Sequence, residues 1–74
     1  MSIHLQDPDK VQELRRMYPA GTRIKLVEMD DVQAPPAGIL GTVQFVDDAG
    51  NIIMRWDNGS GLSLLEGVDR FEKV

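Results

Sequence analysis

Residues 8–18 carry the hydrophobic spacing of a short amphipathic helix. Apolar residues recur at steps of three and four, which places them on one helical face: Val11, Leu14 and Tyr18 or Met17. Asp7 can cap the free N–H groups of the first turn, and Pro8 suits the first helical position. Pro19 ends the pattern, because the residue before a proline is pushed out of helical geometry. We predict a helix over 8–18 that packs on another surface, since so short a helix is marginal alone.

Beyond Gly21 the apolar spacing changes to alternation, which is typical of β-strands. Five short segments show it, separated by turn residues: 22–28, 39–46, 51–56, 61–65 and 70–74. The alternation directs one set of side chains inward: Ile24, Leu26, Val43, Phe45, Ile52, Met54, Trp56, Leu62, Leu64 and Phe71. This layout predicts a mainly β fold, a small SH3-like five-stranded antiparallel barrel. We expect a single domain over 1–74, with the helix at 8–18 and the barrel at 22–73.

The strongest turn signal lies between the third and fourth predicted strands, at Asn58-Gly59. Both residues tolerate the positive φ angles of a type I′ hairpin turn. The hairpin would place two leucines of the return strand opposite the inward residues before the turn: Leu62 and Leu64 opposite Trp56 and Met54. We predict that Trp56 is a core residue whose register the turn holds, because a slip of one residue would direct it outward.

The segment 29–38 interrupts the strands with acidic residues, two adjacent prolines and a glycine. Prolines cannot donate to a sheet ladder, so we expect a long loop here. Its length and its charge make it a candidate protein-binding loop, with four residues of interest: Asp30, Asp31, Pro35 and Pro36.

Charge weighs against one class of partner. The chain has 12 acidic and 8 basic residues and a formal net charge of −4. This balance disfavours non-specific binding to phosphate backbones, where basic patches supply most of the affinity. Four basic residues still lie close together in sequence and form a candidate nucleic-acid patch, which Arg55 would extend: Arg15, Arg16, Arg23 and Lys25.

Targeting features are missing from the sequence. The first ten residues have no basic start, and no apolar run reaches the length of a signal peptide or a membrane span. There is no Cys, so neither disulfides nor thiolate metal sites can support the fold. We expect a cytoplasmic protein held by its apolar core, alone or with a second copy.

Residues suited to catalysis are sparse. His4 is the only His, and without Cys or a credible base a nucleophilic triad cannot be assembled. The pairs Asp30-Asp31 and Asp47-Asp48 are typical of solvated turns, and residues 47–51 lack the ligand spacing of a calcium loop. We expect no enzymatic activity, no catalytic or metal-binding residues and no cofactor.

A set of residues spread over 18–73 resembles a known family. It comprises Tyr18-Pro19-x-Gly21-Thr22-Arg23, Met29-x-Asp31, Ala34-Pro35, Gly38, Gly41-Thr42-Val43, Val46-Asp47-Asp48-x-Gly50, Trp56-Asp57-x-Gly59-Ser60 and Gly67-x-Asp69-x-Phe71. This set resembles a small uncharacterised domain-of-unknown-function family of Gram-positive bacteria, their phages and mobile elements. The resemblance implies a small β fold and brings no assigned catalytic or binding residues.

The segment 41–60 is similar, more weakly, to two kinds of SH3-like domain. One occurs in mind-bomb-type ubiquitin ligases, where it binds peptide segments of a partner. The other is the KOW-type module of ribosome and transcription proteins. Both likenesses imply a fold and do not transfer a function.

The aromatic residues bear on peptide binding. A proline-ligand groove needs several exposed rings, whereas alternation assigns Phe45, Trp56 and Phe71 to the core. Strand addition at an open sheet edge needs only backbone groups and is the better candidate. Val27 and Ile53 break the polar outer pattern; we expect the helix to cover them, the alternative being a self-association patch.

These features favour a non-catalytic module that binds an unknown protein partner or acts as an accessory protein. One alternative is a nucleic-acid-binding KOW-like module that uses the basic patch. The other is a homo-oligomeric structural protein. The homo-oligomer would use the helix or Ile53.

Replacing Gly59 with Val is expected to lower the free energy of unfolding by about 1–2 kcal/mol, because a β-branched residue resists positive φ. Chemical denaturation of the wild type and of Gly59→Val measures the difference. A variant as stable as its parent would show that the hairpin interpretation is wrong.

Overall fold

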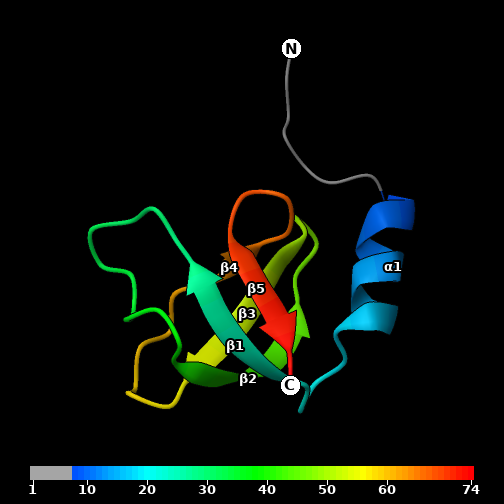
Figure 1. Ribbon diagram of the computed structural model, residues 1–74. Coiled ribbons are helices and arrows are strands. Elements are labelled where there is room, and N and C mark those ends of the chain that lie inside the picture. Colours follow the sequence, from blue (N-terminus) through cyan, green and yellow to red (C-terminus); the bar gives the residue numbers. More distant parts are fainter. Residues whose placement is uncertain (1–7) are drawn as a thin grey trace.

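The computed structural model describes residues 8–74, a helix followed by five strands (Figure 1). The elements are α1 (Pro8–Met17), β1 (Arg23–Glu28), β2 (Leu40–Val46), β3 (Asn51–Trp56), β4 (Leu64–Leu65) and β5 (Arg70–Lys73). The strands form one antiparallel sheet in the order β4-β3-β2-β1-β5, which confirms the mainly β prediction. Between the outer strands β4 and β5 there is only an isolated bridge, Glu66 with Asp69, so closure into a barrel stays a prediction.

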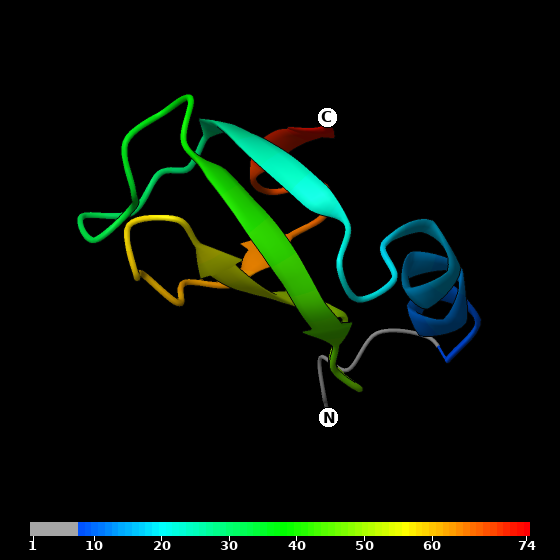
Figure 2. The same ribbon diagram turned by 90° about the horizontal axis from the view of Figure 1, so that it is seen from below.

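Helix α1 ends one residue before its predicted end, although the Tyr18 N–H still donates to the Leu14 carbonyl at 2.8 Å. Val11 and Leu14 are buried as predicted, and the predicted cap, Asp7, lies outside the described residues. Both views place α1 at one side of the sheet, where β2 is the only strand that it approaches (Figures 1 and 2). The expectation that α1 covers Val27 on β1 is therefore wrong, and this side chain stays 38% exposed.

The core lies on the inward faces of β1, β2 and β3, which α1 and β4 complete. Its members are apolar: Val11, Leu14, Ile24, Leu26, Val43, Val46, Ile52, Met54, Trp56 and Leu64. Alternation holds through β1 and β3, where each predicted inward side chain is buried. Phe71 and Tyr18 are half-buried and pack against this cluster.

Strand β2 departs from alternation at a β-bulge. Val43 pairs with Met54, whereas Phe45 pairs with Ile53, which leaves Gln44 as the extra residue. Val46 then faces the core at 3% exposure, while Phe45 is 56% exposed. The prediction that Phe45 belongs to the core is wrong, because a strict period of two assumes a ladder without a bulge.

The turn after β3 contains one left-handed residue. Gly59 has φ 91°, and no non-glycine residue among 8–74 has positive φ, so the predicted type I′ turn is wrong. The Gly59 N–H donates to the Trp56 carbonyl, and the Trp56 N–H donates to the Ser60 carbonyl, both at 2.9 Å. These bonds define a type I turn followed by a left-handed glycine. Asn58 instead accepts the Ser60 N–H through its side-chain oxygen at 2.9 Å, which keeps it in ordinary backbone geometry.

The return strand β4 is shorter than the predicted 61–65, and Leu64 pairs with Ile52 rather than facing Met54. The carbonyl of Leu62 accepts the indole N–H of Trp56 at 2.9 Å. A buried indole N–H needs an acceptor, so residues 61–63 turn toward the ring instead of continuing the ladder.

Gly41 on β2 provides the space for the Trp56 ring. The two residues are register partners, and a Cβ at position 41 would lie 2.5 Å from Cε3 and 3.0 Å from Cδ2 of the indole. Trp56 is only 1% exposed, so the ring cannot retreat into solvent without leaving the core. This close approach requires a residue without a side chain.

Gly41→Ala is expected to lower the free energy of unfolding by about 1–3 kcal/mol, because the added methyl displaces a packed ring. Gly61→Ala is the matched control, since a Cβ there meets no atom within 4 Å. Thermal and chemical denaturation of both variants measure the two effects. Equal stability of Gly41→Ala and Gly61→Ala would contradict the packing of Trp56 on Gly41.

Candidate functional site

The predicted basic patch is divided between two acidic partners at different ends of β2. Arg15 donates from Nε to the Val46 carbonyl at 3.0 Å and forms an ion pair with Asp48 at 2.8 Å. Arg23 makes a two-bond pair with the Asp57 carboxylate at 3.0 and 2.8 Å. The hydrogen bond from Arg23 lowers the pKa of Asp57 and raises the pKa of the guanidinium. Both arginines are therefore committed to internal contacts.

The remaining basic candidates are dispersed. Arg16 lies 3.9 Å from the Glu13 carboxylate, one helical turn away. Lys25 is exposed on β1 with Glu72 as its register partner, and Arg55 is exposed on β3. The geometry does not gather the predicted residues into one free cationic surface.

Loop 29–38 projects from the sheet on the side opposite α1 (Figures 1 and 2). Its base is closed by the Gly38 N–H, which donates to the Leu26 carbonyl at 2.7 Å. Pro35 is buried, so this predicted site residue is structural. The other three predicted residues are exposed: Asp30, Asp31 and Pro36. The loop thus offers an exposed acidic start.

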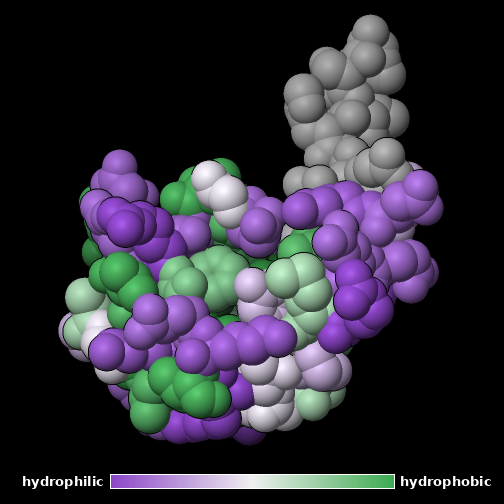
Figure 3. Space-filling view, turned by 45° about the vertical axis from the view of Figure 1, so that its right-hand side comes forward, coloured by the Kyte–Doolittle hydropathy of each residue, from purple (hydrophilic) through white to green (hydrophobic). Residues whose placement is uncertain are grey.

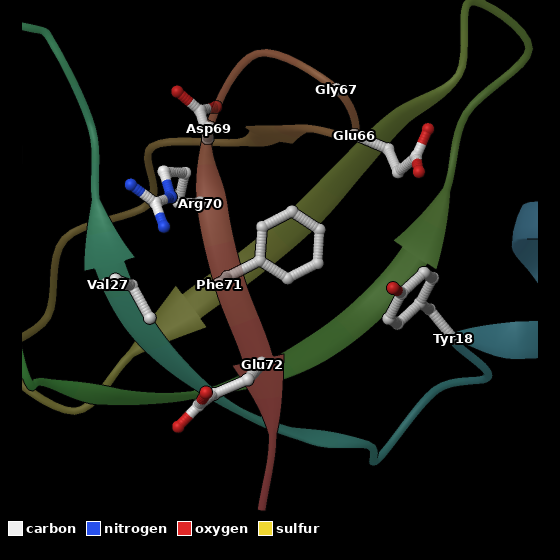
Figure 4. Close-up of a pocket in the computed structure, with 8 residues that line it drawn as sticks. All are labelled: Tyr18, Val27, Glu66, Gly67, Asp69, Arg70, Phe71 and Glu72. Carbon is white, nitrogen blue, oxygen red and sulfur yellow. The ribbon is translucent and has the colours of Figure 1, made fainter.

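A groove of about 330 Å³ lies along β5 and reaches the segment after α1 (Figure 4). The lining comes from Tyr18, Val27 on β1, the turn between β4 and β5, and consecutive residues of β5 itself. Tyr18 and Glu66 lie on the side of β5 away from β1, and the Phe71 ring is directed toward them (Figure 4). The groove therefore borders the edge of β5 that has no strand beside it in the described part of the chain.

The floor of the groove is aromatic. The Tyr18 and Phe71 rings meet edge to face with 5.6 Å between centroids, and the Lys73 ammonium lies 5.1 Å from the Tyr18 centroid. Burial, reinforced by the negative charge of Glu66, raises the pKa of the Tyr18 hydroxyl. Tyr18 is therefore neutral and presents a ring face that already holds a cation.

The rim of the groove is acidic. Glu66 pairs with Lys10 at 3.2 Å, and the Asp69 carboxylate accepts the Leu65 N–H at 2.8 Å. Glu72 supplies a third carboxylate, whereas Arg70 is the single cation of the lining and lies 3.6 Å from Glu28. Figure 3 shows apolar residues interspersed with hydrophilic ones on this side of the molecule.

The free edge of β5 presents unused backbone groups. The Val74 N–H donates to the Arg23 carbonyl at 3.2 Å, which makes Ile24 and Lys73 a non-hydrogen-bonded pair of the antiparallel ladder. Hydrogen-bonded and non-hydrogen-bonded pairs alternate along an antiparallel ladder, so Glu72 forms a hydrogen-bonded pair with Lys25 of β1. The backbone N–H and C=O groups of Phe71 and Lys73 therefore point away from β1. The sequence suggested an open edge in general terms. The strand order leaves two outer strands, β4 and β5, and of these β5 is the longer and has the groove beside it.

A second surface lies on the outer faces of β2, β3 and β4, and we call it the outer apolar strip. Phe45 and Ile53 are opposite each other. Ile53 points away from the core by the alternation of β3, and Phe45 does so because of the bulge in β2. Leu65 is opposite Asn51 and so lies diagonal to Ile53 on the same face, 38% exposed. Sequence reasoning identified Ile53 and missed Phe45, since nothing in the alternation marks the bulge.

Residues 8–74 hold no group of three or more acidic or histidine side chains arranged for a metal, and none of their helices has the length and apolarity to cross a membrane. His4 lies outside the described residues. The absence of catalysis and of cofactors stays a prediction.

The fold and these surfaces define a compact, mainly β domain with an N-terminal helix and an open strand edge. The chain belongs to the DUF4314 family, a domain of unknown function whose model matches residues 7–74. This confirms the resemblance to an uncharacterised domain family; the taxonomic range and the SH3-like and KOW-type likenesses stay predictions. Searches of curated proteins and of solved structures found no significant match.

Proposed function

We propose that this domain is a non-catalytic protein-binding module that adds an extended segment of a partner to the free edge of β5. The observation that carries the proposal is the pairing pattern of that strand. Phe71 and Lys73 direct their backbone donors and acceptors away from β1, beside a groove. Main-chain hydrogen bonds to such an edge supply affinity in strand addition, and adjacent pockets supply specificity.

The groove fits this mode of binding. A residue of the added strand opposite Phe71 points to the same face as the Phe71 ring, because opposite residues of a ladder share a face. Its side chain then lies against the Tyr18 and Phe71 rings, which bound the groove. An edge left open would otherwise be a site of uncontrolled pairing. The family resemblance over 18–73 supports a bacterial, phage or mobile-element system, and a chain without Cys fits the cytoplasm.

The edge can be blocked without disturbing the ladder to β1, because the N–H of Lys73 is not used there. Lys73→Pro removes this N–H, and Lys73→Thr is the matched control that keeps it. Peptides selected from a random library against the wild type are expected to shift the amide resonances of Phe71 and Lys73. Their affinity for Lys73→Pro should fall at least tenfold relative to Lys73→Thr. Equal affinity for the two variants would contradict strand addition.

The same peptides test loop 29–38 as the competing surface. The double variant Asp30→Ser with Pro36→Ser changes two exposed side chains of the loop and leaves buried Pro35 in place. Retained affinity is expected. A loss in this variant would assign binding to the loop instead.

Self-association is a second candidate function, favoured by the outer apolar strip. Phe45 is 56% exposed beside Ile53, and exposed aromatic residues are common at protein interfaces. A small core also gains stability from a second copy. The nucleic-acid alternative has less support, because Arg15 and Arg23 are paired with Asp48 and Asp57.

If the outer apolar strip joins two copies, the wild type forms dimers at millimolar concentration and Phe45→Ser does not. Sedimentation equilibrium measures the mass of both, and Val32→Ser is the control, since Val32 is exposed on the loop away from the strip. A monomeric wild type would remove this candidate and leave strand addition untouched.

A further inference from the structure

We infer that the segment captured at β5 is basic, and that a lysine or arginine of the partner takes the position beside Tyr18 that Lys73 of this chain now holds. The inference rests on the proposed function and adds the chemistry of the partner. It follows from the charges around the groove and from the two ammonium groups already bound there.

The charges of the groove are complementary to a cationic segment. Glu66, Asp69 and Glu72 line it, against one arginine, Arg70, that already faces Glu28 at 3.6 Å. The whole chain carries a formal net charge of −4, which adds a longer-range attraction for cations. An acidic or phosphorylated segment would meet repulsion at the same edge.

Two lysines of this chain show what the groove accepts. The Lys73 ammonium lies 5.1 Å from the centroid of Tyr18, and the Lys10 ammonium lies 3.2 Å from Glu66. An aromatic face next to a carboxylate is a favourable site for an ammonium or guanidinium group. Neither lysine belongs to the groove lining, and their side chains leave the backbone groups of the free β5 edge available.

A partner lysine opposite Phe71 can contact both the aromatic floor and the acidic rim of the groove. Its aliphatic stem packs on the Phe71 and Tyr18 rings, and its ammonium reaches toward Glu66. Lys73 then has to leave the Tyr18 ring, because its ammonium and that of the partner lysine compete for the same ring face. Removing the charge of Lys73 strengthens binding, and removing the charge of Glu66 weakens it.

The test uses three blocked heptapeptides that differ in one residue type: Thr-Lys-Thr-Lys-Thr-Lys-Thr and its Gln and Glu counterparts. Amide chemical-shift titration of the whole chain measures each dissociation constant. The Lys peptide is expected to bind tightest, with shifts at Phe71 and Lys73, and to weaken with added salt. Lys73→Gln raises its affinity about two- to fivefold, as expected for an exposed cation–π contact. Glu66→Gln lowers it about two- to fivefold, as expected for an exposed ion pair.

Glu13→Gln is the control for net charge, since Glu13 lies on α1 outside the groove lining, and its affinity should fall less than that of Glu66→Gln. Amide spectra confirm that each variant is folded.

Equal binding of the three peptides with shifts on β5 overturns the basic preference and leaves strand addition standing. A Lys preference that survives Glu66→Gln, or no gain in Lys73→Gln, also overturns it. No shift on β5 with any peptide, selected peptides included, overturns both proposals.

Discussion

The packing of Trp56 against Gly41 is the contact on which the rest of the domain depends. The ring needs a register partner without a side chain and an acceptor for its indole N–H, which Leu62 provides at 2.9 Å. The first requirement aligns β2 with β3, and the second bends residues 61–63 away from the sheet. As a result β4 is reduced to two residues, and the chain reaches β5 through a tight turn beside the core.

This arrangement explains why an edge is left open next to aromatic residues. β5 pairs with β1 alone, so one side of a four-residue strand keeps its backbone groups available. Tyr18, placed by the end of α1, covers the Phe71 ring without reaching the edge as a strand would. The groove is thus bounded by Tyr18, which follows α1, rather than by a sixth strand beside β5. A site of this kind combines backbone hydrogen bonds with side-chain selection.

Sequence patterns succeeded wherever a local period controls the structure. The helix stripe at Val11 and Leu14 and the alternation in β1 and β3 correspond to buried faces, and Trp56 is in the core as its neighbours Ile52 and Met54 require. They failed at Phe45, since a bulge changes which face a residue occupies without changing local composition. The turn at Asn58-Gly59 was located correctly. Its type depends on whether the hairpin loop has two residues or three, and the Asn-Gly pair alone does not distinguish these lengths.

The amino-acid sequence by itself determined the class of fold, the number and order of its elements, and the family, because these follow from periods and punctuating residues along one chain. Tertiary structure alone decided the candidate site. Tyr18 is far in sequence from Glu66 and Phe71, and only the tertiary structure brings the three to one groove. It likewise gave Arg15 and Arg23 their acidic partners, Asp48 and Asp57, from more than 30 residues away. Long-range charge pairing and strand edges depend on which segments become neighbours, and a one-dimensional pattern contains no such information.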